Sequence, residues 1–147
     1  MTRGRRPLKA LIEAEQIALR RGAVQPAPGK RGDAFDLIIF EETRTVLVKV
    51  KRSATHFTNP LEVLHQNQRE VARLHQVPLT LVTAREFWIR SPRGKWQFFL
   101  IRHDSVIEIQ DDGTYIHRAA LPVIIPGPAR ENDSAGINGE FPSENNK

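Results

Sequence analysis

Apolar residues at helical spacing predict a helix over residues 7–21. The apolar positions are Leu8, Leu11, Ile12, Ala18 and Leu19. Gly22 follows two arginines and is predicted to end the helix as its C′ residue. Glu15 falls on the apolar face and Glu13 lies on its flank. A carboxylate in an apolar setting is costly unless it is paired or binds a cation. Glu15 therefore lies either at the edge of the apolar face or beside such a partner.

Two short apolar runs around a charged turn predict a pair of strands over residues 36–40 and 45–51. A Pro- and Gly-rich passage at residues 24–30 precedes them and is expected to form a short edge strand and a loop. Because side chains alternate along a strand, the second strand separates its valines from its lysines. Val46, Val48 and Val50 share one face, and Leu47, Lys49 and Lys51 share the other. Two lysines on one strand face indicate either a solvated edge or a phosphate-binding surface.

A second helix is predicted to begin at Asn59. Asn59 is suited to the N-cap, Pro60 to the first helical position and Glu62 to a capping box. The helix is predicted to run to residue 75 or 76. Its apolar stripe consists of Leu61, Leu64, Val71 and Leu74. Gln68 interrupts that stripe, which predicts either a backbone partner or a polar pocket for its amide.

The remaining pattern predicts further strands. Residues 79–83 are almost wholly apolar, as in a strand covered on both faces. Two hairpins follow, one pairing residues 87–90 with 96–102 around the turn at 91–95, and a weaker one pairing 106–109 with 115–117. This order of elements predicts an α/β domain over residues 1–125, with a central mixed sheet of about five strands and a helix on each face. Residues 126–147 are rich in Gly, Pro, Asn and Ser, which predicts a disordered tail.

Composition and charge narrow the function classes. The chain has no cysteine, which excludes disulfides, thiolate metal sites and a cysteine nucleophile. No apolar run approaches the roughly 20 residues that cross a bilayer, and the basic N-terminus lacks the apolar stretch of a secretory signal. We therefore expect a cytoplasmic protein with no membrane partner. The net charge is +5, but residues 1–125 hold 20 basic and 13 acidic side chains. This excess suits either a polyanionic partner such as DNA or a basic protein without one.

The charged ends of the two strands carry a resemblance to a known family. Gly32-x-x-x-Asp36 opens the first strand and Lys49-Val-Lys51 closes the second, so that Asp36 stands 13 residues before Lys49 and 15 before Lys51. With the carboxylates of the first helix and the glutamines of the capped helix, this stretch resembles the PD-(D/E)XK nucleases. Within them it is most similar to the archaeal-type Holliday junction resolvases. The resemblance covers roughly residues 5–105 and implies a restriction-endonuclease-like fold.

The resemblance also implies a site that hydrolyses phosphodiester bonds of branched or structured DNA with Mg²⁺ or Mn²⁺. Asp36 and a backbone carbonyl, that of Val50, are expected to hold the metal, with Glu13 or Glu15 as the carboxylate from the first helix. Lys51 is expected to orient the attacking water, so that Asp36, Lys51 and Glu13 form the expected catalytic set. Because a junction presents two equivalent strands, the resemblance further implies a homodimer.

One residue departs from the family pattern, because Lys49 stands where the family has Glu. A pair of unit charges about 4 Å apart is worth roughly 4 kcal/mol at an effective dielectric near 20, and about twice that with a divalent ion. Changing a ligand charge from −1 to +1 would therefore abolish ordinary Mg²⁺ affinity unless another carboxylate takes over. The candidates are Glu13, Glu15, Asp33, Glu62 and Glu70.

Three hypotheses stay open. The first is a metal-dependent DNA endonuclease with a displaced carboxylate. The second is a DNA-binding module without catalysis on the same fold, in which Lys49, Lys51 and Arg52 contact phosphate directly. The further DNA-binding candidates are Lys30, Arg31, Gln68, Arg69 and Arg73. The third is a protein-interaction domain without a nucleic-acid partner. A second carboxylate oxygen within about 4–5 Å of Asp36 would favour the endonuclease, and lysines alone around Asp36 would favour the binding module.

Overall fold

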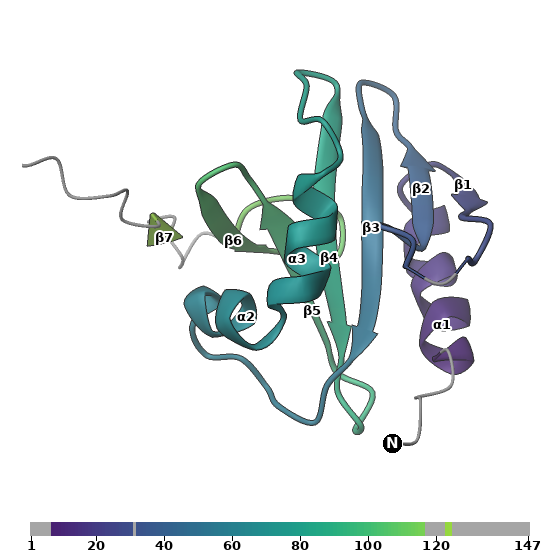
Figure 1. Ribbon diagram of the computed structural model, residues 1–147. Coiled ribbons are helices and arrows are strands. Elements are labelled where there is room, and N and C mark those ends of the chain that lie inside the picture. The colour runs from purple at the N-terminus through teal and green to yellow at the C-terminus, as the bar shows by residue number, and fades with distance from the viewer. Residues whose placement is uncertain (1–6, 31, 117–122, 125–147) are drawn as a thin grey trace, which may run out of the picture.

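A mixed sheet with helices on both sides organises the chain, as the computed structural model in Figure 1 shows. The structure describes residues 7–30, 32–116 and 123–124. The helices are α1 (Leu8–Leu19), α2 (Pro60–Gln66) and α3 (Gln68–His75). The strands are β1 (Ala23–Pro26), β2 (Leu37–Phe40), β3 (Thr45–Arg52), β4 (Thr83–Arg90), β5 (Trp96–Ile101), β6 (Ser105–Ile109) and β7 (Val123–Ile124). The predicted tail at residues 126–147 lies outside the described residues, as does His117.

Neighbouring strands pair in chain order from β1 to β7, and β3 with β4 is the parallel pair among antiparallel ones. Parallel strands need a crossover connection, which α2 and α3 supply. α1 packs on one face of the sheet, and α2 and α3 pack on the other. The predicted α/β class and mixed sheet are confirmed, although six strands of more than two residues replace the expected five. In the part of the chain that the structure describes, no helix has the length and apolar character needed to span a membrane.

α1 packs on the sheet mainly through alanines, and only part of the predicted stripe faces the core. Ala10, Ala14 and Ala18 are fully buried. Three members of the predicted stripe, Leu8, Ile12 and Leu19, are exposed. Small side chains let the helix lie close to the bulky residues beneath it, which include the valines of β3 and Trp88. The helical period and two members of the predicted stripe, the buried Ala18 and the partly buried Leu11, are confirmed, but the core-facing side is centred on the alanines and not on the leucines.

Gly22 has a different role from the predicted C′ residue. α1 ends at Leu19 with Arg20 as its C-cap, and Gly22 does not adopt a positive φ. Instead, β1 pairs Ala23 with Phe40 directly after this glycine. A Cβ atom at position 22 would lie 2.1 Å from the carbonyl oxygen of Phe40. Glycine is therefore required by the close approach of two backbones, which brings the end of α1 against β2.

The helix predicted from Asn59 is divided in two at Asn67. The N-cap is confirmed, because Asn59 Oδ1 accepts a hydrogen bond from the Leu61 N–H at 2.9 Å. Asn67 leaves the helical region at φ −127° and ψ 34°, and its buried amide donates to the Val63 carbonyl at 2.9 Å. The break turns Gln68 outward to an exposed position. The buried amide expected in the apolar stripe is therefore that of Asn67.

The apolar segment at residues 79–83 is not the predicted buried strand. Residues 79–82 form an exposed connection in which Leu81 is fully exposed, and β4 begins at Thr83. Ala84 to Arg90 is buried throughout, although it contains Arg85, Glu86 and Arg90. Ion pairs with other elements compensate Glu86 and Arg90, and backbone carbonyls accept hydrogen bonds from Arg85, so the less apolar segment occupies the centre of the sheet. The hairpin of β4 and β5 is confirmed, and Tyr115 pairs with Ile109 as the weaker hairpin predicts.

A buried ionic cluster connects α1 to the sheet. Glu86 on β4 accepts two hydrogen bonds from Arg21 and one from Trp88 Nε1, each at 2.8 Å. Arg21 Nε donates at 2.7 Å to Glu41, which Arg44 also contacts. Burial opposes the charge of Arg21, but its hydrogen bonds and ion pairs with Glu86 and Glu41 leave its pKa above the usual value. The residues that follow α1 are thereby fixed against β4 and the β2–β3 turn.

The variant Glu86→Gln is expected to lower the free energy of unfolding by about 3 kcal/mol, because it removes one partner of a buried ion pair. Asp111→Asn makes the same chemical change in the exposed pair with Arg20 and is expected to cost at most about 1 kcal/mol. Urea unfolding followed by far-UV circular dichroism compares the two variants. Equal losses would contradict a structural role for the buried cluster.

Candidate functional site

Asp36 lies directly before β2 and faces β3. Its N–H donates to the Val48 carbonyl at 2.7 Å, which extends the pairing of the two strands by one residue. Leu37 of β2 lies opposite Val48 of β3, so the same antiparallel register places Asp36 opposite Lys49. The side chain of Asp36 is 9% exposed and that of Lys49 is 16% exposed. Strand pairing therefore fixes an acid and a base side by side in a largely water-excluded position.

The Asp36 carboxylate is bonded to the backbone and to a lysine. Oδ2 accepts a hydrogen bond from the Val50 N–H at 2.9 Å. Both oxygens lie 3.3 Å from Lys49 Nζ, which also lies 3.4 Å from the carbonyl oxygen of Asp33. The ammonium group of Lys49 therefore neutralises the charge of the Asp36 carboxylate.

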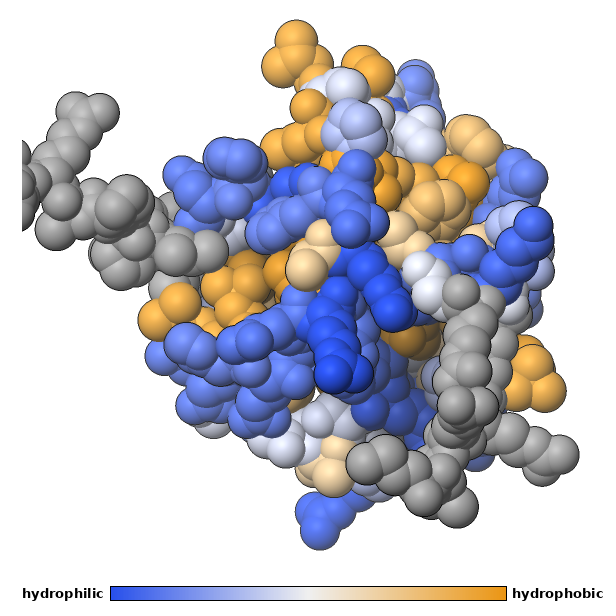
Figure 2. Space-filling view, in the orientation of Figure 1, coloured by the Kyte–Doolittle hydropathy of each residue, from blue (hydrophilic) through white to orange (hydrophobic). Residues whose placement is uncertain are grey.

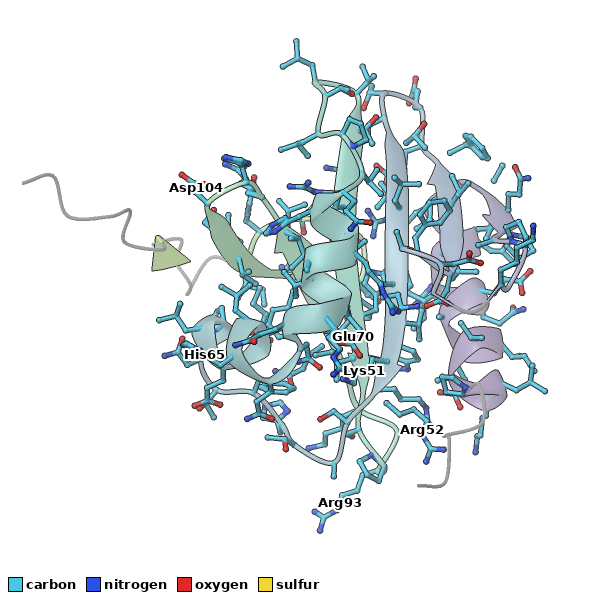
Figure 3. All side chains as sticks on the ribbon, in the orientation of Figure 1. Lys51, Arg52, His65, Glu70, Arg93 and Asp104 are labelled. Atoms are coloured by element: carbon cyan, nitrogen blue, oxygen red, sulfur yellow. The ribbon has the colours of Figure 1, made fainter. Side chains whose placement is uncertain are left out.

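Lys51 forms a second ion pair farther along the same strand face. Its Nζ lies 3.0 Å from Glu70 Oε1 on α3, and the two side chains are 33% and 25% exposed. In Figure 3 the two side chains meet near the start of α3, and Arg52 lies farther toward the α1 side of β3. Burial tends to raise the pKa of Glu70, but the hydrogen bond from Lys51 and the charges of Lys51 and Lys49 bring that pKa below its usual value. Glu70 therefore stays ionised at neutral pH.

Glu13 lies across the sheet from this site. It forms a two-pronged ion pair with Arg90 at the end of β4, with Oε1 accepting from Nη2 at 2.9 Å. The hydrogen bond from Arg90 lowers the pKa of Glu13, and the same bond raises the pKa of Arg90. α1 packs on the valine face of β3, whereas Asp36 contacts the lysine face. The structure does not bring Glu13 together with Asp36 and Lys51, so the expected catalytic set is not assembled.

The acidic residues around Lys49 do not fit the expected Mg²⁺ or Mn²⁺ site. Mg²⁺ takes about six oxygen ligands in near-octahedral geometry. Asp36 is bonded to an ammonium group and to the Val50 N–H, and the described residues contain no group of three or more His, Asp or Glu side chains suited to a metal. One observation favours a metal site. Asp33 Oδ2 is buried without a hydrogen-bond partner.

The end of β3 opens into a cleft of about 880 Å³. Lys51 and Arg52 line it from β3, Lys9 from the start of α1, and Glu70 from α3. Hydrophilic side chains gather along the middle of this face of the molecule, over α3 and the end of β3 (Figure 2). Among the described residues that line the cleft, three carry positive charge and Glu70 carries negative charge. The cleft is therefore suited to an anion.

The other predicted contact residues are distributed unevenly. Lys30 is exposed in the loop after β1, and Gln68 is exposed at the start of α3. Arg31 lies outside the described residues. Lys9 was not predicted, since its position in the cleft depends on how α1 sits on the sheet. A basic residue at the start of an amphipathic helix carries no sequence signal for such a position.

Comparison with protein families and with curated proteins gives no guide to this cleft. No protein-family model matches the chain, and no curated protein matches it. Its chemistry therefore has to be inferred from the charges and contacts described above.

The Lys51–Glu70 pair predicts a pH-dependent contribution to stability. A folded-state pKa below the ordinary value of 4.5 gives a contribution that is complete above pH 4.5 and is lost as the pH falls through the folded-state value. Glu70→Gln is expected to lower the free energy of unfolding at pH 7 by about 1 kcal/mol or less, since the pair is partly exposed. The difference from the wild type should shrink toward pH 3.

Urea unfolding at both pH values measures this difference. Glu42→Gln, in the exposed β2–β3 turn, is the matched control and should change stability by less than about 0.5 kcal/mol. A loss in Glu70→Gln that is as large at pH 3 as at pH 7 would contradict the role of the ion pair.

Proposed function

We propose that this chain is a DNA-binding module on a restriction-endonuclease-like fold and that it contacts phosphates directly through lysine and arginine. Support for the fold comes from the order of α1, three antiparallel strands, a helical crossover and the parallel strand β4. This order agrees with the resemblance to PD-(D/E)XK nucleases. Asp36 and Lys51 lie at the strand ends where that resemblance expects the reacting groups.

The observation that carries the proposal is the contact between Lys49 and Asp36. In a metal-dependent nuclease a divalent ion would link the carboxylate to the phosphate. Here the carboxylate is neutralised by a side-chain ammonium group at 3.3 Å. A cation that belongs to the protein leaves little electrostatic reason to bind a metal ion. The neighbouring lysine and arginine side chains then remain available for the polyanion itself.

The cleft at the end of β3 supplies the anion site. Lys9, Lys51 and Arg52 converge on it from two elements, and Glu70 is paired with Lys51. Neutralising phosphates with such side chains releases counterions, which makes affinity high at low salt and weak at high salt. Lys30 and Gln68 are exposed and extend the proposed surface.

The resemblance adds two elements to the proposal, namely that the DNA is branched or otherwise structured and that the protein acts as a homodimer. The composition of the chain adds a third, a cytoplasmic location. Sedimentation of the free protein and of its DNA complex tests the homodimer. A monomer in both states would remove that element and leave DNA binding intact.

The double variant Lys51→Ala/Arg52→Ala is expected to weaken DNA binding about tenfold or more at low salt. It should also reduce the slope of log affinity against log salt by about two, since each phosphate contact contributes about 0.9 to that slope. Fluorescence anisotropy with labelled duplex and four-way junction measures both quantities.

Arg20→Ala/Arg102→Ala is the matched control for this variant. It removes two positive charges from exposed residues that do not line the cleft. Its affinity should stay within about threefold of the wild type. Equal weakening in the two double variants would show that net charge alone binds DNA, and affinity that is insensitive to salt would contradict the proposal.

A metal-dependent endonuclease is the second candidate function, and the buried, unbonded oxygen of Asp33 is the observation that favours it. That function requires a displaced carboxylate to join Asp36 despite the charge of Lys49. Under the binding proposal, wild type and Asp36→Ala both leave a labelled four-way junction intact in Mg²⁺ or Mn²⁺. Cleavage by the wild type that Asp36→Ala abolishes would replace the binding proposal with the endonuclease.

A further inference from the structure

A second basic groove lies next to the cleft at the end of β3. Its volume is about 350 Å³, and it is lined by Ala54, His56, Ser91, Pro92, Arg93 and Lys95. Ala54 and Pro92 line the first cleft as well, so the two hollows adjoin along these residues. Unlike the first cleft, the described lining of this groove includes no carboxylate. It therefore offers a second site for phosphate.

The turn between β4 and β5 lines the groove through Ser91, Pro92, Arg93 and Lys95, and its Pro92 also lines the cleft. The Ser91 N–H donates to the Lys95 carbonyl at 2.8 Å, and the Gly94 N–H donates to the Ser91 carbonyl at 3.0 Å. The Lys95 N–H donates to Ser91 Oγ at 3.1 Å, and Gly94 adopts φ +78°. Proline restricts φ at position 92. The turn is thus a preformed element whose shape does not depend on a ligand.

Contacts at the base of the turn attach it to the rest of the protein. Arg90, the last residue of β4, donates to the Ser91 carbonyl at 3.3 Å and is held by its ion pair with Glu13. The turn is consequently fixed relative to α1, which also supplies Lys9 to the first cleft. Arg93 extends from the turn at the lower end of the molecule, below Lys51 and Arg52 (Figure 3).

We propose that the β4–β5 turn is a branch-recognition element, with one DNA backbone bound in each groove and Pro92 at the point where they separate. This inference rests on the proposed DNA binding and concerns which DNA is preferred. Arg93 and Lys95 bind phosphates on one side of Pro92, and Lys51 and Arg52 bind them on the other. A small apolar side chain such as proline also suits contact with the open base step at a branch.

The preference follows from the stiffness of DNA. A linear duplex has a persistence length of about 50 nm, so bending it around a protruding turn within a few base pairs costs free energy. At a branch point the strands already diverge, and both grooves fill without that cost. Linear duplex is therefore expected to use the cleft at the end of β3, and branched DNA to use both grooves.

Arg93→Ala/Lys95→Ala tests the proposal with a four-way junction and a linear duplex of the same length in fluorescence anisotropy. Loss of two phosphate contacts should weaken junction binding about tenfold and duplex binding less than about threefold, which removes most of the preference. Lys51→Ala/Arg52→Ala should weaken both DNAs. Pro92→Ala keeps every charge and should reduce the preference without changing the salt slope on duplex.

The outcomes separate this inference from the proposed function. Equal weakening on both DNAs, or no change on either, would overturn branch recognition while leaving DNA binding intact. A wild-type protein that binds neither DNA would overturn the proposed function itself. All five variant residues are exposed or half-exposed, and unchanged thermal unfolding would exclude loss of folding as the cause.

Discussion

The two central strands carry charges into positions that the helices and the neighbouring strands cover, and these charges are compensated from other elements. Glu86 is paired with Arg21, Arg90 with Glu13, Lys49 with Asp36 and Lys51 with Glu70. Arg85 is compensated only in part and without an ion pair, because the carbonyls of Val77 and Ile101 accept hydrogen bonds from it while its Nη2 is buried without a partner. Breaking a buried pair by removing one partner costs several kcal/mol. The placement of α1, α3 and β2 against the central strands therefore depends on charge compensation as well as on apolar burial.

This dependence explains which parts of the fold the sequence predicts. Periodicity predicts both helical regions, the strands around Asp36 and Lys51, and the hairpin of β4 and β5, because each follows from local spacing and turn residues. The sequence pattern fails at the centre of the sheet. Hydropathy assigns the buried strand to residues 79–83 and not to the segment that contains Glu86. Glu86 becomes a central-strand residue only because Arg21, 65 positions away, is buried with it. No local pattern contains that pairing.

The candidate site also has features that local sequence patterns predict and features that they do not. Alternation along β3 correctly puts Lys49 and Lys51 on one face, and strand pairing brings Asp36 to Lys49. The partner of Glu13 could not be predicted, because Arg90 stands 77 residues away and reaches it across the packing of α1 on the sheet. Arg93 and Lys95 gave only a turn signal in the sequence. Their relation to the end of β3 appears when the crossover through α2 and α3 makes β3 and β4 parallel neighbours.

The difference in exposure between the two lysine pairs decides which lysine meets phosphate under the proposed function. Lys49 and Asp36 are 16% and 9% exposed, so separating them would leave a carboxylate without its cation in a nearly dry position. Lys51 and Glu70 are 33% and 25% exposed, and ion pairs nearer to water are worth only about 0–1 kcal/mol. A phosphate could replace Glu70 at Lys51 at little cost, but could not replace Asp36 at Lys49. The sequence predicts that Lys49 binds DNA, but on this argument its role is to neutralise Asp36. Lys51 and Arg52 are then the residues that contact phosphate.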